Sequence, residues 1–270
     1  MPELPEVETV RRGLERELVG RSVVSVAWRG ARLRATPDGG LQPLAGRSFE
    51  AFGRHGKLLL CRLDDASTLC VHLGMTGKLL FARQGEGERP HTHLRLGLDD
   101  GRELRYVDPR RFGGLALHPA GAAVPELGRH GPDALSPAFT PAFLQQALGA
   151  SRAPLKAFLL DQAKVAGVGN IYACEALWRA RLSPRRVART VGRGKAQELH
   201  QAIVGVLQEA IEGGGTSFND YVDTFGQPGK HVQRLAVFQR EGSACPRCGT
   251  HVRRFPQGGR STFHCPRCQR

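Results

Sequence analysis

Four cysteines near the C-terminus constrain this chain more than any other feature of its sequence. Cys245 and Cys248 form one C-x2-C pair, Cys265 and Cys268 form a second, and 16 residues separate the two pairs. This spacing is typical of a tetrahedral structural zinc site, and the spacer is long enough for a β-hairpin that turns at 257–260. Because the protein supplies all four ligands, the zinc ion has no open position for catalysis and serves to fold the hairpin.

Two other uses of these cysteines compete with zinc. A pair of disulfides is disfavoured because the acidic opening segment, residues 1–6, lacks the apolar core of a secretory signal and indicates the cytosol. A redox C-x-x-C motif is expected beside a βαβ pattern, and none surrounds these pairs. The remaining cysteines, Cys61, Cys70 and Cys174, lie in apolar runs and are predicted to be buried thiols.

The charge of the chain indicates a polyanionic partner. Lysine and arginine exceed aspartate and glutamate by 39 − 25 = 14, and the sequence pI is about 10.3. Nucleic acid is the simplest such partner. A membrane surface is the competing interpretation, but no long basic amphipathic helix and no membrane-spanning apolar stretch is present. Only 6 of the 39 basic residues are lysines, so amine chemistry has few candidate groups besides the N-terminus.

Hydrophobic periodicity predicts an α+β fold in several parts. A helix over 5–19 precedes short strands between 22 and 118, whose even spacing favours an antiparallel β-sandwich. Helical periodicity returns after a linker, and a long polar loop over 216–230 follows it. The predicted domains are an N-terminal sandwich domain (1–120), a linker (121–136), a helical domain (137–235) and a zinc hairpin (236–270). The predicted strands are 22–28, 58–63, 68–73, 92–98 and 102–107, and the predicted helices are 141–148, 154–161, 170–180 and 195–212.

The second residue is a potential nucleophile. Removal of Met1 before the small Pro2 leaves a free secondary amine, about 10–20% of it unprotonated at pH 7, against about 0.04% for a lysine. Such an amine can attack an aldehyde-like carbon to form a Schiff base, and the neighbouring Glu3 could act as acid or base. An ordinary processed terminus is the simpler interpretation of these residues alone.

Five sequence blocks, taken together, resemble one known family. They are Met1-Pro-Glu-Leu-Pro-Glu-Val-Glu-Thr9, His72-Leu-Gly-Met75, Asp108-Pro-Arg-Arg-Phe-Gly113, Gly167-Val-Gly-Asn-Ile-Tyr172 and the C-terminal cysteine pairs. The residues of these blocks and the order of the blocks along the chain are similar to those of the bacterial formamidopyrimidine-DNA glycosylases. The resemblance covers essentially the whole chain. The resemblance implies an N-terminal helix with a β-sandwich, a helical domain with a helix–two-turn–helix motif, and a zinc-finger hairpin.

The resemblance also implies a reaction and the residues that perform it. Members of the family excise oxidised purines, chiefly 8-oxoguanine and formamidopyrimidines, from duplex DNA and then cut the abasic strand by β,δ-elimination. The amine of Pro2 matches the nucleophile that attacks the sugar C1′, and Glu3 matches its acid/base partner. Lys57 matches a proton donor in β-elimination, and Arg260 matches the hairpin residue associated with δ-elimination. One structural zinc ion is the only cofactor implied.

Further positions match residues of the family that contact DNA. His91, Arg110, Arg152 and Asn170 match phosphate-contacting or base-contacting positions. Met75, Arg110 and Phe112 match the residues that fill the space left by the extruded nucleotide. The loop 216–230 corresponds to the loop that covers the extruded base, although its sequence over 217–221 differs from that of other members. The resemblance further implies a monomer that acts on damaged double-stranded DNA in the cytoplasm, associated with the nucleoid, and away from membranes.

Two alternative functions stay open at this point. The sister endonuclease VIII type prefers oxidised pyrimidines and shares the Pro-Glu start, but Leu4 and the Arg-Arg-Phe block favour the purine enzymes. A zinc-ribbon DNA-binding protein without catalysis is the other alternative, for which the N-terminus would be irrelevant.

Overall fold

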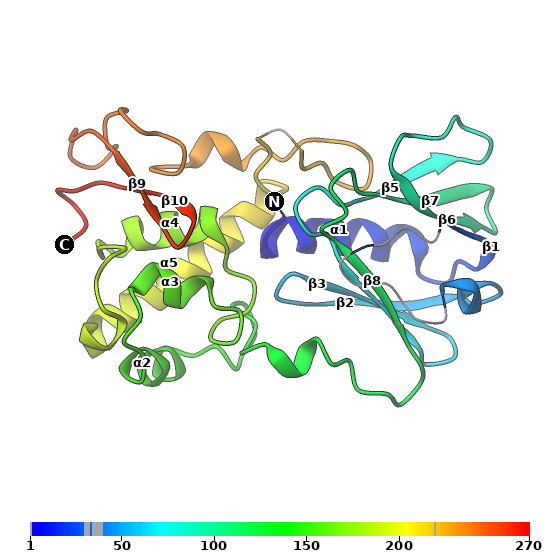
Figure 1. Ribbon diagram of the computed structural model, residues 1–270, viewed down its shortest axis with the longest axis horizontal. Helices are drawn as coiled ribbons and strands as arrows, with labels where there is room; N and C mark the ends of the chain where they lie inside the picture. The colour runs from blue at the N-terminus through cyan, green and yellow to red at the C-terminus, as the bar shows by residue number, and fades with distance from the viewer. Residues whose placement is uncertain (1, 30–32, 34–39, 219) are drawn as a thin grey trace. The chain divides into compact units, whose positions relative to one another are not determined.

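The computed structural model describes residues 2–29, 33, 40–218 and 220–270, and the chain folds into two compact units (Figure 1). The first unit contains residues up to 128 together with 213–232, and the second contains 129–212 and 233–270. The polar loop over 216–230 therefore belongs to the same unit as the N-terminal helix. Met1, whose removal is predicted, and Asn219, within the predicted polar loop, lie outside the described residues.

Two antiparallel four-stranded sheets form the β-sandwich of the first unit, as the sequence predicts. One sheet has the strand order β1-β6-β7-β5, and the other has the order β2-β3-β4-β8. The first sheet contains β1 (Val23–Trp28), β5 (Lys78–Arg83), β6 (Thr92–Leu98) and β7 (Arg102–Val107). The second contains β2 (Phe49–His55), β3 (Leu58–Leu63), β4 (Thr68–His72) and β8 (Gly114–His118).

The N-terminal helix α1 (Leu4–Leu18) completes the core of this unit. Its residues Val7, Val10, Leu14 and Leu18 recur at helical spacing and are all buried in one apolar cluster with residues of both sheets. The helix packs against β2 and β3. Burial of this face fixes α1 on the sandwich, and the start of α1 is consequently a rigid position for the second and third residues of the chain.

The second unit is helical apart from its C-terminal hairpin (Figure 1). Helix α5 packs against α2 and α4, and α4 also contacts α3 and the hairpin. The sequence predicts all four helices to within a few residues of their observed ends. They are α2 (Pro141–Gly149), α3 (Leu155–Leu160), α4 (Asn170–Arg179) and α5 (Arg193–Glu212), and the hairpin consists of β9 (Arg253–Gln257) and β10 (Arg260–His264). No helix of the described residues is long and apolar enough to cross a membrane.

Candidate functional site

The buried start of α1 presents the predicted nucleophile and its neighbouring carboxylate. Pro2 is buried, and Glu3 and Glu6 are each 1% exposed. Glu3 and Glu6 form a capping box, in which the Glu3 amide N–H donates to Glu6 Oε2 at 2.7 Å. The other oxygen of the same carboxylate, Glu6 Oε1, accepts from the Thr216 amide at 2.8 Å. One buried carboxylate therefore joins the N-terminus to the polar loop.

The loop over 213–230 is closed at its base and tied to α1 near its middle. The Lys230 amide donates to the Gly213 carbonyl at 2.8 Å, and the Tyr221 hydroxyl donates to the Glu6 carbonyl at 3.4 Å. Gly215 has a φ of +86°, and a Cβ there would lie 2.8 Å from the Tyr221 ring. A side chain at position 215 would therefore clash with the contact that holds the loop on α1.

Burial, followed by the charge of Glu6, raises the pKa of Tyr221 above its ordinary value. The phenol consequently stays protonated at neutral pH and remains a hydrogen-bond donor. This end of the unit combines a fixed carboxylate beside residue 2 with a loop that is held against it.

A second group of predicted residues is held together by Asp108, which is fully buried. Asp108 Oδ1 accepts from the Thr76 hydroxyl at 2.5 Å, and Oδ2 accepts from the Gly113 amide at 2.8 Å and the Tyr106 hydroxyl at 3.3 Å. The Asp108 carbonyl oxygen lies 2.9 Å from His93 Nε2. The carboxylate thus joins the loop that follows β4 to the loop that follows β7.

These two loops present Met75, Arg110 and Phe112. The Arg110 guanidinium lies 4.6 Å from the centre of the Phe112 ring, which is 45% exposed. A Cβ on Gly74 would lie only 2.4 Å from the Phe112 carbonyl carbon, so the loops meet backbone to backbone. Met75 is half-buried beside them. The structure therefore brings these three residues into neighbouring loops of the first unit.

Lys57 and His91 lie at other turns of the same unit. Lys57 is half-buried in the tight turn between β2 and β3. His91 is exposed immediately before β6, with a φ of +64°, and its carbonyl accepts from the Asp108 amide at 3.1 Å. His93, two residues further, is buried by its contact with the Asp108 carbonyl, so it has the structural role expected for a strand residue.

The second unit contains the other residues that are predicted to contact DNA. Arg152 is exposed before α3, and Arg260 is exposed at the start of β10, beside the turn made by Gly258 and Gly259. Asn170 is the first residue of α4, and Gly169 rather than Asn170 is the N-cap. The Asn170 side-chain amide instead donates to the Ser261 carbonyl at 3.1 Å.

The four C-terminal cysteines have the geometry of a zinc site. Their sulfur atoms all lie within 4.8 Å of one another, with 4.0 Å between Cys245 and Cys268 and 3.5 Å between Cys248 and Cys265. Tetrahedral Zn–S bonds of about 2.3 Å place sulfur atoms about 3.8 Å apart, which matches these distances. All seven cysteines are described, and none of them forms a disulfide. The thiolates therefore fit one structural zinc ion.

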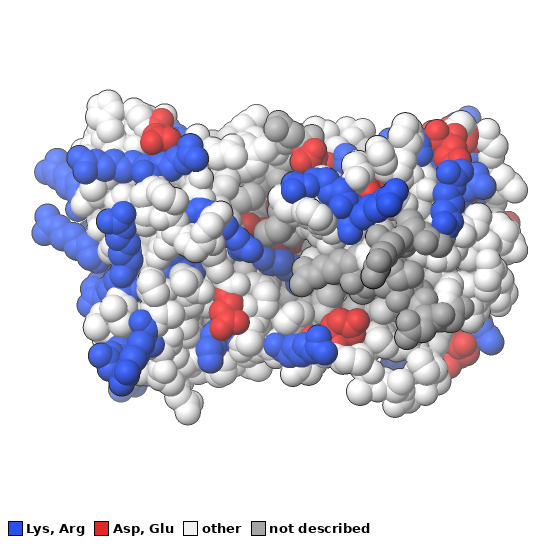
Figure 2. All heavy atoms as spheres, in the orientation of Figure 1, with Lys and Arg blue, Asp and Glu red and all other residues white. Residues whose placement is uncertain are grey.

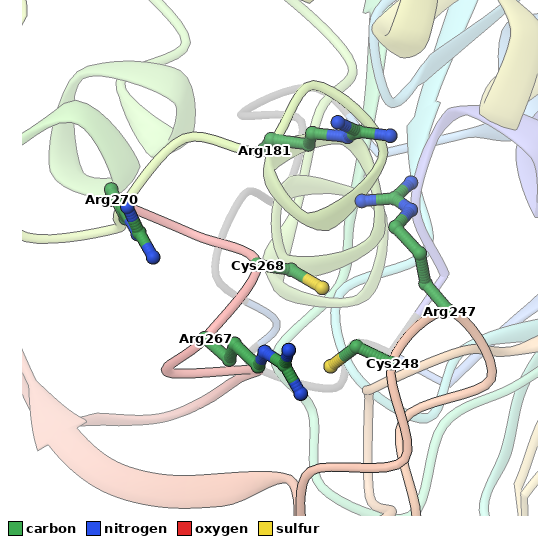
Figure 3. A pocket seen from close by; sticks show the side chains of 6 residues that line it. All are labelled: Arg181, Arg247, Cys248, Arg267, Cys268 and Arg270. Carbon is green, nitrogen blue, oxygen red and sulfur yellow. The ribbon is translucent and has the colours of Figure 1, made fainter.

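Arginines surround the outer side of this cluster. Cys248 and Cys268 face a surface hollow of about 660 Å³ (Figure 3). Its other lining residues are Arg181, Arg247, Arg267 and Arg270. A zinc ion with four thiolates carries a net negative charge, and nearby guanidinium groups stabilise that charge. Figure 2 shows basic side chains gathered over this end of the second unit.

The supporting roles of three residues were not predicted from the sequence. Glu6 and Asp108 lie inside the blocks that carry the family resemblance, but nothing local indicates their hydrogen-bond partners. Lys156 is 1% exposed, although lysine is ordinarily a surface residue. The apolar neighbours of Lys156 in the sequence, Leu155 and Phe158, are the only signal that could have indicated its burial.

Three family models match the chain in succession. They describe the formamidopyrimidine-DNA glycosylase N-terminal domain over residues 1–115, its H2TH domain over 130–221, and a zinc finger found in FPG and IleRS over 242–270. A formamidopyrimidine-DNA glycosylase of Acidiphilium cryptum is 45% identical over 251 residues, which are 92% of this chain and 90% of that protein.

Solved structures resemble the whole chain. The complex of a Lactococcus lactis FPG mutant with DNA containing Fapy-dG has a TM-score of 0.93 and 34% identity. The complex of Lactococcus lactis Fpg with DNA containing an abasic site has a TM-score of 0.92 and 33% identity. Both alignments cover 100% of each chain.

Proposed function

The chain belongs to the formamidopyrimidine-DNA glycosylase family, and from this premise we propose how its residues excise oxidised purines and cut the abasic strand. It is a DNA glycosylase and abasic-site lyase of base-excision repair. The observation that carries the residue assignment is the start of α1. There, Glu3 is buried beside residue 2, and Glu6 joins both to the loop over 213–230.

The first step is attack of the Pro2 nitrogen on C1′ of the damaged nucleotide. Removal of Met1 frees this amine, whose lone pair forms the N–C1′ bond as the bond from C1′ to the base breaks and the base leaves with the electron pair. Glu3 exchanges protons with the sugar and the amine as the ring opens to an iminium. The fixed position of Glu3 at the helix start keeps its carboxyl group beside the reacting nitrogen.

The iminium then makes strand cleavage possible. It withdraws electrons from C2′, so loss of the C2′ proton expels the 3′ phosphate in β-elimination, and a second elimination expels the 5′ phosphate. We assign Lys57 as a proton donor and phosphate contact in the first elimination. Arg260 supports the second, because a fixed guanidinium beside the phosphate stabilises developing negative charge.

The remaining predicted residues bind the damaged duplex. His91, Arg152 and Asn170 are assigned to the DNA backbone. Met75, Arg110 and Phe112 fill the space that the extruded nucleotide leaves, with Arg110 facing the orphaned base. The stacking of Arg110 on Phe112 and the Asp108 network support a wedge that is formed before DNA binds. We further propose that the loop over 216–230 covers the extruded base.

The positive charge of the chain supports phosphate binding and predicts an affinity that falls steeply with salt. We propose that the protein acts as a monomer, in the cytoplasm and associated with the nucleoid, since its substrate is genomic DNA. The endonuclease VIII alternative is not favoured, because the matched relatives are formamidopyrimidine-DNA glycosylases.

The test blocks the N-terminal amine as an amide. A short uncleaved N-terminal extension, acetylated at its own terminus, should reduce the borohydride-trapped adduct with 8-oxoguanine DNA to below about 1% of that of the processed protein. The amines that remain are those of lysines, whose unprotonated fraction at pH 7 is several-hundred-fold smaller. The matched control carries the same extension at the C-terminus. An undiminished adduct with the blocked chain would show that another amine is the nucleophile. Preferential action on oxidised pyrimidines would instead support the endonuclease VIII type.

A further inference from the structure

A lysine that the proposed reaction does not use is buried under the zinc hairpin. Lys156 lies in the first turn of α3 and is 1% exposed. Its ammonium donates to the Thr262 hydroxyl at 2.7 Å and to the Ser261 carbonyl at 3.1 Å. These two residues follow Arg260 directly in β10. A buried ammonium group is costly unless it is well hydrogen-bonded, so these contacts strongly favour one position of the strand.

Lys156 is also linked to the other strand of the hairpin. Its backbone amide donates to the Pro184 carbonyl at 3.2 Å, and the Gln257 side chain donates to the same carbonyl at 3.2 Å. Gln257 pairs with Arg260 across the turn. The start of α3 is therefore connected to both residues at the base of the turn. The Lys156 ammonium holds β10 just after Arg260, and the Pro184 carbonyl joins the Lys156 amide to Gln257.

The same contacts extend to α4. Asn170 donates to the Ser261 carbonyl that Lys156 also contacts, so two helices hold one peptide group next to Arg260. Lys156 and Arg260 further line one hollow of about 280 Å³, together with Ala157, Leu160, Asp161, Gln257 and Gly258. The arginine is itself exposed, and its backbone is the part that the unit fixes.

We propose that Lys156 is a positioning residue for Arg260, which holds the hairpin turn where the guanidinium can reach the phosphate that leaves in δ-elimination. The inference rests on the proposed role of Arg260. Displacement of a charged group by about 1 Å can reduce its contribution to a reaction by on the order of 100-fold, whereas steps that do not use the group are unaffected. Lys156 should consequently influence δ-elimination more than base excision or β-elimination.

The test uses Lys156→Met in the full-length zinc protein, with duplex DNA that carries a preformed abasic site. The ratio of δ-elimination to β-elimination product should fall about tenfold, while zinc content and the rate of β-elimination change less than about twofold. The matched control is Lys195→Met, which removes a partly exposed lysine on α5 that is paired with Glu198. An unchanged product ratio, or an equal loss of both steps together with loss of zinc, would overturn the inference.

A second pair of variants keeps the lysine and changes its partner. Thr262→Val removes the hydroxyl that lies 2.7 Å from the ammonium, and Thr262→Ser retains it. The valine variant should lower the product ratio, and the serine variant should restore it; equal ratios would contradict a positioning role. Arg260→Gln is measured in parallel. If δ-elimination is intact in Arg260→Gln, the proposed role of Arg260 is wrong. If δ-elimination is lost in Arg260→Gln but retained in the Lys156 and Thr262 variants, only the Lys156 inference is rejected.

Discussion

The start of α1 and the zinc hairpin are both short segments that carry proposed catalytic residues, but different forces hold them. Helix α1 buries Val7, Leu14 and Leu18 in a core shared with two sheets. The hairpin has two five-residue strands, and most side chains of β9 are at least partly exposed. Two strands of this length are marginally stable alone, so metal coordination, together with the contacts of β10 with α3 and α4, supplies the stability that apolar burial supplies to α1.

The two segments are stabilised differently because their proposed functions place different demands on them. The proposed nucleophile, Pro2, needs a desolvated and rigid environment, which a large core provides. The hairpin needs exposed arginines that can meet phosphate, and exposed arginines contribute little to a core. A zinc ion stabilises the hairpin without covering its charged surface. We therefore expect that each segment can be disrupted while the other stays intact.

Removal of the metal should have the largest effect. Cys265→Ser should release zinc, unfold the hairpin and weaken binding to damaged DNA on the order of 100-fold, because the hairpin arginines lose their positions. At enzyme concentrations that saturate the DNA, the Pro2 adduct should still form. Zinc content, DNA affinity and borohydride trapping measure the three effects.

Cys61→Ala is the matched control for this variant. Burial raises the pKa of the Cys61 thiol, which makes it a poor metal ligand, and it lies in the first unit. The control should retain zinc and full DNA affinity. If Cys265→Ser binds damaged DNA as tightly as the unmodified protein, the hairpin does not bind phosphate as proposed.

Loss of the Asp108 carboxylate should have an intermediate effect, confined to the first unit. Asp108→Ala leaves the Thr76 and Tyr106 hydroxyls and the Gly113 amide without their shared acceptor, which should lower the free energy of unfolding by about 3 kcal/mol. DNA affinity should fall as the wedge loops separate, but zinc content should stay unchanged. Urea denaturation checks the stability, and Asp64→Asn, at an exposed aspartate, is the control. Coupled loss of zinc would show that the hairpin depends on the integrity of the first unit.

The smallest effect concerns the pH dependence of α1. Although burial opposes the shift, hydrogen bonds from Arg11 and Arg12 and the charge of Arg54 lower the pKa of Glu8. A carboxyl with a lowered folded-state pKa stabilises the protein above its unfolded pKa, and this contribution disappears as the pH falls through the folded-state value. Glu8→Gln should therefore cost about 1 kcal/mol at pH 7 and progressively less as the pH falls. Thermal unfolding of the zinc-free Cys265→Ser chain, measured over a series of falling pH values, separates this effect from acid release of zinc. A cost of Glu8→Gln that does not change with pH would contradict it.

Local patterns were sufficient to predict most of the elements. The spacing of Val7, Leu14 and Leu18 predicts α1, and the cysteine spacing predicts the metal site, because each signal is contained in one short stretch of the sequence. Strands β2, β5 and β8 were not individually predicted. The zinc ligands came from spacing alone, whereas the roles of Lys57 and Arg260 in the elimination steps came only from the family resemblance.

The supporting contacts could not be predicted, because their partners are distant in the sequence. The hydrogen bond between Glu6 and Thr216 joins residues 210 positions apart, and the one between Lys156 and Thr262 joins residues 106 positions apart. Asn170 shows the limit of a local rule. Its position at a helix start suggests an N-cap, but Gly169 caps the helix and frees the Asn170 amide to contact Ser261.

The contact between Glu6 and Thr216 has a consequence for biosynthesis. A ribosome adding about 5–20 residues per second needs roughly 10–40 s after making Glu6 before it reaches Thr216. Through that interval the nascent chain carries its amine without the loop that is tied to it. A translation product truncated before residue 216 therefore lacks the loop that completes the proposed active site. Translation order thus delays assembly around the proposed nucleophile until most of the second unit has been made.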